Sequence, residues 1–270
     1  FELPRDGSGD FGKYSFYVAL AGSIPFWVNL GIDKSFVTFT STQKDEEIYN
    51  NYLGLFWKSK LILTLITFIG CLTYYLFAEQ RTLIMVALLS GLVFGFSESF
   101  KPPAESKKNF NFVSVIVPIR NLILLICAIL LLAQKALTLQ NIVLSLFISN
   151  GIYLIATFIL YKIYVAPFTT KTTLGFKTLF QDTKWLFIKE FVQNYASKTE
   201  IFLLSYFVGI EVIHEEERSY FAGAFSLCMV LPIITNSLTK VLLPTVTNIK
   251  QVESLKIYIR KLTKTLLISV

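Results

Sequence analysis

The stretch FVSVIVPIRNLILLICAILLLA, residues 112–133, carries a single charged side chain, Arg120, among 22 residues. A helix needs about 20 predominantly apolar residues to cross the hydrocarbon core of a bilayer. Apolar and polar residues do not alternate here, so the pattern favours a helix over a strand of a membrane barrel. The stretch therefore predicts a transmembrane helix.

Other stretches of the chain have the same length and character. Complete transmembrane helices are predicted at Tyr14–Phe39, Leu53–Phe77, Thr82–Phe100, Phe112–Ala133, Leu139–Tyr161, Trp185–Gly209 and Ser219–Thr247. Another apolar run begins near Ile257 and continues to Val270, where the sequence ends. Because the chain also begins at Phe1 rather than at a Met, we expect a fragment of a longer protein. The predicted fold class is an all-α polytopic membrane protein with seven full transmembrane helices and the start of an eighth.

The composition agrees with a membrane protein. Hydrophobic residues make up 54% of the chain and charged residues 16%, against about 25% charged residues in soluble domains. The net charge of +7 would suggest nucleic acid in a soluble protein, but here it follows from basic loops beside the membrane, so no nucleic-acid partner is expected. The three cysteines lie within apolar spans without paired spacing, and they predict neither a disulfide framework nor a metal site.

Lys and Arg are distributed unevenly between alternate connectors. One set of connectors, counted together with residues of the adjoining helix ends such as Lys58, Lys60 and Lys189, holds sixteen of them, and the other set holds five. The positive-inside rule places the richer set in the cytoplasm, which predicts a multi-pass protein of the cell inner (cytoplasmic) membrane. The segments expected to face outward are Phe1–Lys13, Ala78–Arg81, Gln134–Thr138 and Ile210–Arg218.

The longest connector, residues 162–184, contains Pro167, a Thr-rich patch and a short amphipathic piece. This composition is typical of a hinge or an interfacial helix between two helical bundles. The predicted domains are an N-terminal bundle (1–161), a cytoplasmic linker (162–184) and the start of a C-terminal bundle (185–270).

The predicted span Trp185–Gly209 has a polar stripe. At 100° per residue, most of its polar side chains fall in one arc of roughly 160°. The arc contains Glu190, Gln193, Asn194, Ser197, Lys198, Glu200 and Ser205. Lys198 lies about 14 Å beyond Lys189, near the membrane midplane, where a buried Lys costs about 2.5–3.5 kcal/mol. The stripe favours the lining of a water-filled cavity, and the alternative is a structural Lys paired with a carboxylate on a neighbouring helix.

Other charged or polar residues also lie within spans. Arg120 lies about 12 Å inside its span, directly after Pro118, and it needs an anion or a polar cavity because it stays charged. Snorkelling to the headgroups is the alternative. Lys34 lies near the cytoplasmic end of the first span. The candidate substrate-binding residues are Arg120, Lys34, Lys198, Glu190, Asn194, Ser197, Glu200, Asn236 and Lys240.

Motifs of an enzyme do not occur in the sequence. It has no Gly-rich phosphate loop, no cluster with metal-ligand spacing and no pairing of a nucleophile with a base. The outward connectors are too short to build a catalytic face. Buried cations spread over several helices favour the passage of an anionic group, so we expect no catalytic residues, no cofactor and no enzyme activity.

Short motifs along the chain resemble a known family. Gly9-Asp-Phe-Gly-Lys-Tyr14 and Asn29-Leu-Gly-Ile32 are similar to the opening of bacterial polysaccharide-repeat-unit (oligosaccharide) flippases. These belong to the multidrug/oligosaccharidyl-lipid/polysaccharide exporter superfamily. Three further segments resemble motifs in later helices of that family, namely Lys198–Gly209, Tyr220–Ala224 and Val241–Pro244. The chain departs from the family pattern at Asn29 and Glu200, where Asp is usual.

The resemblance implies two six-helix bundles around a central cavity with alternating access, the first helix being absent from this chain. The implied substrate is a polyprenyl-diphosphate-linked oligosaccharide for O-antigen or exopolysaccharide synthesis, moved from the cytoplasmic to the outer leaflet. Arg120, Lys34 and Lys198 would offer cations to the diphosphate, and a polysaccharide polymerase would be a partner. Two alternatives stay open, namely a drug or cation exporter of the same superfamily and a membrane-embedded glycan polymerase or transferase.

Overall fold

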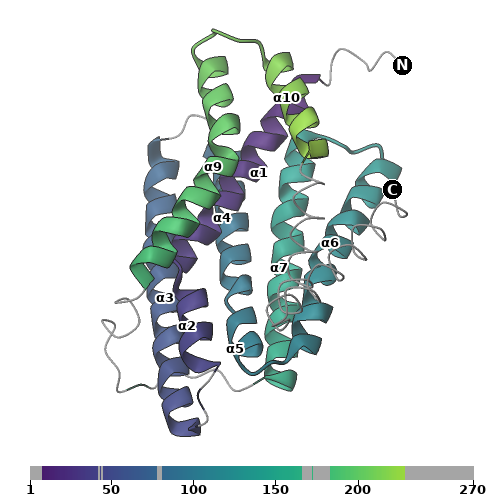
Figure 1. Cartoon of the computed structure of the whole chain (residues 1–270). Coiled ribbons are helices and arrows are strands. Elements are labelled where there is room, and N and C mark those ends of the chain that lie inside the picture. The colour runs from purple at the N-terminus through teal and green to yellow at the C-terminus, as the bar shows by residue number, and fades with distance from the viewer. Residues whose placement is uncertain are drawn as a thin grey trace, which may run out of the picture. The chain divides into compact units, whose positions relative to one another are not determined.

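The structure, a computed structural model, describes residues 8–41, 43, 45–77, 81–165, 172 and 183–228. The helices are α1 (Ser8–Asn29), α2 (Ile32–Thr40), α3 (Glu46–Phe77), α4 (Arg81–Glu98), α5 (Lys101–Ser106), α6 (Phe110–Ala133), α7 (Leu139–Tyr164), α9 (Thr183–Gly209) and α10 (Glu215–Cys228). No strand occurs in this part of the chain (Figure 1). The predicted all-α class is therefore confirmed.

The chain divides into two compact units, Phe1–Ser219 and Tyr220–Val270. The first unit contains the helices from α1 to α9, and the second is described only over the last residues of α10. Most of the predicted linker 162–184 lies outside the described residues. The predicted division into two bundles stays a prediction.

Four stretches in the described part are long and apolar enough to cross a membrane. These are Glu46–Phe77, Thr82–Ser106, Asn111–Ala133 and Leu139–Tyr164, and the bent pair α1–α2 makes a fifth if it counts as one span. They coincide with the first five predicted spans, so a multi-pass membrane protein is confirmed. Helix α9 forms where predicted but is less apolar, because it carries the polar stripe. The full count of seven spans and a partial eighth stays a prediction, since the last spans fall largely outside the described residues.

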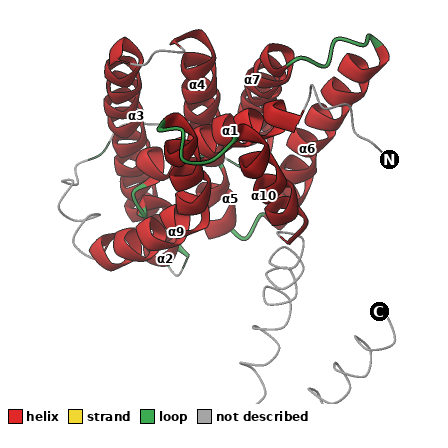
Figure 2. Ribbon diagram, turned by 90° about the horizontal axis from the view of Figure 1, so that it is seen from above, coloured by secondary structure: helices red, strands yellow, loops and turns green. Residues whose placement is uncertain are grey.

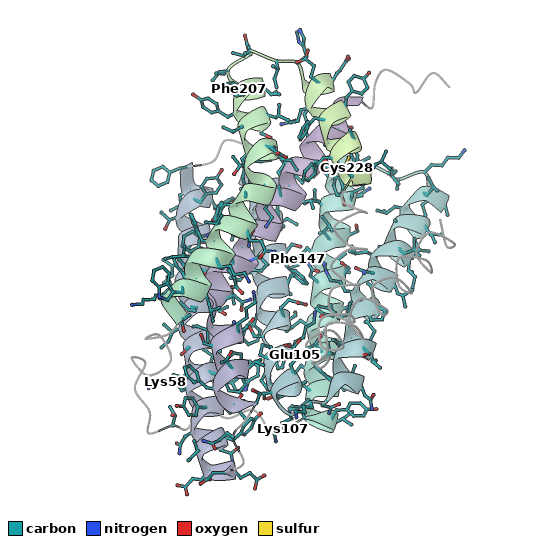
Figure 3. The ribbon with its side chains drawn as sticks, in the orientation of Figure 1. Lys58, Glu105, Lys107, Phe147, Phe207 and Cys228 are labelled. Carbon is teal, nitrogen blue, oxygen red and sulfur yellow. The ribbon has the colours of Figure 1, made fainter. Side chains whose placement is uncertain are left out.

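The first unit exposes large apolar side chains, as expected for a surface in contact with lipid. Large apolar side chains of α3 and α6, such as Leu65, Ile69, Leu125 and Leu132, are exposed over half or more of their area. Figure 3 shows Lys58 and Lys107 towards one end of the bundle and Phe207 towards the other. The predicted grouping of basic connectors on the cytoplasmic side stays a prediction.

The first predicted span is broken in the structure. Instead of one helix over Tyr14–Phe39, α1 ends at Asn29 and α2 begins at Ile32 with a bend of 44°. Leu30 and Gly31 make the corner with φ angles of 42° and 75°, a left-handed conformation that Gly adopts without a steric penalty. A Cβ on Gly31 would also lie 3.0 Å from the backbone nitrogen of Phe187 in α9. The corner therefore combines a sharp turn with a close approach to α9.

The helices of the first unit pack in layers. Seen along their axes, α3, α4, α7 and α6 follow one another in a row, and α1 lies against α4 with α9 on its far side (Figure 2). Glycines allow the contact between α1 and α4, because a Cβ on Gly91 would lie 2.2 Å from the carbonyl oxygen of Ala21. An aromatic core closes the end near α2 and α5. Its buried rings include Phe36, Phe56, Trp57, Phe100, Tyr153 and Tyr161.

Candidate substrate-binding site

A polar pocket of about 370 Å³ opens between the α1–α2 corner and α9. We call it the α1–α9 pocket. It is lined by Pro25, Phe26, Asn29, Lys34, Glu190, Gln193, Asn194 and Lys198. Four of the nine predicted site residues, Lys34, Glu190, Asn194 and Lys198, thus lie around one space. The polar stripe of α9 faces this pocket over about two helical turns, which is the direction that the periodicity of the sequence predicts.

Ion pairing and hydrogen bonding join α2 to α9 beside the pocket. Lys34 Nζ lies 2.9 Å from Glu190 Oε1, and the two side chains are 50% and 20% exposed. Ser35 Oγ and Thr183 Oγ1 form a buried hydrogen bond of 2.8 Å between the same helices. The charge of Glu190 is therefore offset by a cation that also lines the pocket.

Lys198 has neutral partners. Its ammonium donates to the carbonyl oxygen of Gly22 at 2.5 Å and to the side-chain oxygen of Asn194, one turn earlier on α9. Within the described part of the chain, no carboxylate forms an ion pair with it. The sequence alternative of a Lys paired with a carboxylate on a neighbouring helix is thus not what this part of the structure contains. The ammonium keeps a positive charge that no described acidic group offsets.

Other predicted site residues lie elsewhere. Glu200 is exposed on α9 and does not line the pocket. The side chain of Ser197 lies outside the described residues, as do Asn236 and Lys240. The structure therefore says nothing of these last three side chains.

Arg120 lies on α6, away from the α1–α9 pocket. Its Nε donates to Asn150 Oδ1 on α7 at 3.0 Å, and its guanidinium lies 3.9 Å from the centroid of the Phe94 ring on α4. Asn150 is held in turn by a hydrogen bond of 2.9 Å to Ser90 Oγ. The structure does not bring Arg120 together with Lys34 and Lys198 around one pocket.

The carboxylate of Glu98, at the end of α4, has partners other than Arg120. Its two carboxylate oxygens accept from Lys101 at 2.7 Å and from the hydroxyl of Tyr153 at 2.9 Å. No described carboxylate forms an ion pair with Arg120. A neutral amide and an aromatic face therefore hold this cation.

Lys60 is the residue that sequence reasoning missed. It was counted with the cytoplasmic connectors, yet its side chain is 0% exposed within α3 and lies 2.6 Å from Asp33 Oδ1. A signal was available, because Leu53, Phe56, Trp57 and Lys60 follow the i, i+3, i+4, i+7 spacing of one buried helix face. Lys60 also donates to the side-chain oxygen of Asn29, which lines the pocket.

The described side chains of the pocket are suited to recognising an anion. Two ammonium groups and several amides can donate hydrogen bonds to an anion, and such charge-assisted bonds are stronger than neutral ones. Among the side chains that the structure describes, no serine, cysteine or histidine lines the pocket. The described residues contain no group of three or more His, Cys, Asp or Glu side chains placed to hold a metal ion.

Comparison with known proteins identifies the family. No match to the chain is found among curated proteins or among solved structures. A family model described as polysaccharide biosynthesis protein matches residues 7–250, which includes every helix named above and the whole α1–α9 pocket. The resemblance seen in the motifs around Gly9 and Asn29 is confirmed. The chain therefore belongs to the polysaccharide biosynthesis protein family.

Proposed function

We propose that this protein is a flippase that moves a polyprenyl-diphosphate-linked oligosaccharide from the cytoplasmic to the outer leaflet of the inner membrane by alternating access. The observation that carries the proposal is the α1–α9 pocket, in which Lys34 and Lys198 lie within a membrane-spanning member of this family. A hydrophilic glycan needs a polar path through the bilayer, and a diphosphate needs cations along that path.

Lys198 is the better placed of the two cations to bind the diphosphate. Its partners, the Gly22 carbonyl and the Asn194 side chain, are neutral, so an anionic oxygen can approach without displacing a carboxylate. Lys34 is half exposed and forms an ion pair with Glu190, so an anionic substrate must compete with the Glu190 carboxylate for this ammonium. The amides of Asn29, Gln193 and Asn194 supply further donors and acceptors for sugar hydroxyls or phosphate oxygens.

The position of the pocket agrees with alternating access. On the predicted domain division, α1 and α2 belong to the first bundle and α9 opens the second. The pocket would then lie at the interface between the two bundles, which opens and closes during transport. The ion pair Lys34–Glu190 would join the two bundles across this interface. A flipped substrate would next be used by a polysaccharide polymerase, which we propose as a partner.

Two rival functions fit the geometry less well. A drug or cation exporter needs an acidic group available to a cation, whereas Glu190 is already paired with Lys34. A polymerase or transferase needs a catalytic face, whereas the described connectors between α6 and α7 and between α9 and α10 span only a few residues each. We therefore propose translocation rather than catalysis.

Substitution of Lys198 tests the proposal. In the full-length protein, Lys198→Gln should reduce surface glycan about tenfold or more at an unchanged membrane protein level, because a hydrogen bond to a charged group contributes about 1.5–3 kcal/mol. Lys198→Arg should retain part of the activity. Lys189→Gln is the matched control, because Lys189 is exposed on the same helix and does not line the pocket. Normal glycan display with Lys198→Gln would exclude the proposed role.

A further inference from the structure

The corner between α1 and α2 holds the ammonium of Lys60 among oxygen atoms. Lys60 Nζ lies 3.4 Å from the carbonyl oxygen of Val28 and 2.6 Å from Asp33 Oδ1, and it also donates to Asn29 Oδ1. The Lys60 side chain is fully buried. Three oxygens from three different residues of the corner thus surround one ammonium group, which belongs to a side chain of α3.

Two of these oxygens depend on a cation at this place. Val28 is in the last turn of α1, where carbonyl groups lack helical partners and the helix dipole is negative. Asp33 Oδ1 is buried and has no hydrogen-bond partner in the described chain apart from the ion pair with Lys60. Without a positive charge, a buried carboxylate oxygen and an unpaired carbonyl would remain, and both states are costly.

We propose that the α1–α2 corner is a monovalent-cation site whose resident cation is the Lys60 ammonium, and that removing this side chain opens a site for Na⁺. Broken helices in transporters coordinate small cations through unwound backbone carbonyls and the carbonyl end of a half-helix, and this corner has such a carbonyl end. Here the cation is covalently tethered to α3. The corner is therefore held without an exchangeable ion.

The net charge of the oxygen ligands matches a monovalent cation. Asp33 contributes one negative charge, and the other two ligands are neutral oxygens. The neighbouring Glu190 is already paired with Lys34. The ring of Phe56 lies 5.4 Å from Lys60 Nζ, which adds a cation–π attraction for the ammonium. A divalent ion would leave an uncompensated charge in a buried place.

The site has a consequence for the α1–α9 pocket. Asn29 lines that pocket and accepts from Lys60, and Lys34 follows Asp33 directly. Lys60 is thus a positioning residue, which holds the corner that presents both pocket side chains. This role does not depend on which molecule the pocket binds.

The test is the salt dependence of unfolding of the full-length protein in lipid nanodiscs. Tm is measured in NaCl and in choline chloride at equal ionic strength. Lys60→Ala should unfold at a lower temperature than the native protein in choline chloride, and Na⁺ should raise its Tm by about 3 °C or more. The native protein and Lys58→Ala, an exposed change on the same helix, should show no difference between the two salts.

Two further variants separate ion binding from general weakening. Lys60→Met keeps the space filled without the charge, so it should be destabilised and insensitive to Na⁺. Lys60→Ala combined with Asp33→Asn should lose the response to Na⁺, because the carboxylate ligand is gone. Lys60→Ser, which leaves the same space, is measured alongside Lys60→Ala in case the latter yields no folded protein.

Equal Tm values of both small-residue variants in the two salts, or no folded protein from either variant in either salt, would overturn the proposal. A response to Na⁺ that persists with Asp33→Asn would overturn it as well. Folded protein obtained only when membranes are solubilised in NaCl would support it. None of these measurements involves a glycan, so the outcome is independent of the proposed flippase function.

Discussion

The ammonium of Lys198 donates to the backbone carbonyl of Gly22, and 2.5 Å separate the two atoms. This bond crosses from α9 to the middle of α1 and fixes the cation at the wall of the α1–α9 pocket. A Cβ added to Gly22 would lie 3.4 Å from Lys198 Cε. A side chain larger than a methyl group at position 22 would therefore meet the lysine.

Enlarging Gly22 should move Lys198. We expect Gly22→Ala to have a small effect, since its Cβ would make an ordinary contact, and Gly22→Val to lower glycan display strongly at unchanged protein level. Gly151→Ala is the control, because a Cβ there would meet nothing within 4 Å. Surface glycan and membrane protein level are measured together in a complementation strain. Full activity of Gly22→Val would mean that the position of Lys198 is unimportant.

Linking α2 to α9 should block transport. Ser35 Oγ and Thr183 Oγ1 are 2.8 Å apart, which is close enough for Ser35→Cys and Thr183→Cys to form a disulfide. In a background without the three native cysteines, the oxidised double variant should lose flipping, and a reductant should restore it. Each single variant serves as a control. Undiminished flipping by the cross-linked protein would show that α2 and α9 do not need to separate.

Filling the contact between α1 and α4 should impair folding. Gly91→Ala places a Cβ 2.2 Å from the Ala21 carbonyl oxygen, and such overpacking costs about 1–3 kcal/mol or more. Gly70→Ala in α3 meets nothing within 4 Å and should be neutral or stabilising by about 0.5–1 kcal/mol. Thermal unfolding of the purified full-length variants compares the two. The prediction is contradicted if both variants unfold at the same temperature.

Arg120 has no described carboxylate partner, so we predict that its charge is needed for activity. Arg120→Ala should lower glycan display while the protein still inserts, and Arg120→Lys should retain part of the activity because the charge remains. Asn150→Ala should give an intermediate loss, since Asn150 accepts from Arg120 Nε. A parallel fall in protein level and glycan would instead assign Arg120 to the packing of α4, α6 and α7.

The helices themselves were predictable, because each satisfies its own backbone and its apolar length shows in the sequence. The direction of the α9 stripe was predictable for the same reason, since a period of 3.6 residues fixes which side chains share a face. That rule places Glu190, Asn194 and Lys198 together. It does not say which helix lies opposite, so the contact between Lys198 and Gly22 could not be predicted.

The errors have physical reasons. Counting Lys60 with its neighbour Lys58 ignored that two residues along a helix turn by about 200°, so one is exposed and the other is buried. The corner at Leu30 and Gly31 was missed because apolar residues occur on both sides of it, and the whole stretch was taken as one span. The binding role of Arg120 stays a prediction, because its position relative to Lys34 and Lys198 depends on tertiary packing, which charge alone does not give.

The glycine contact between α4 and α1 also determines which parts can move. At Gly91 and Gly95 the two backbones touch, since added Cβ atoms would lie 2.2 Å and 2.9 Å from atoms of α1. Helices packed this closely cannot slide past each other without a clash. We therefore expect a motion that opens the pocket to move α1 and α4 together as one rigid unit, with its hinge outside their shared interface.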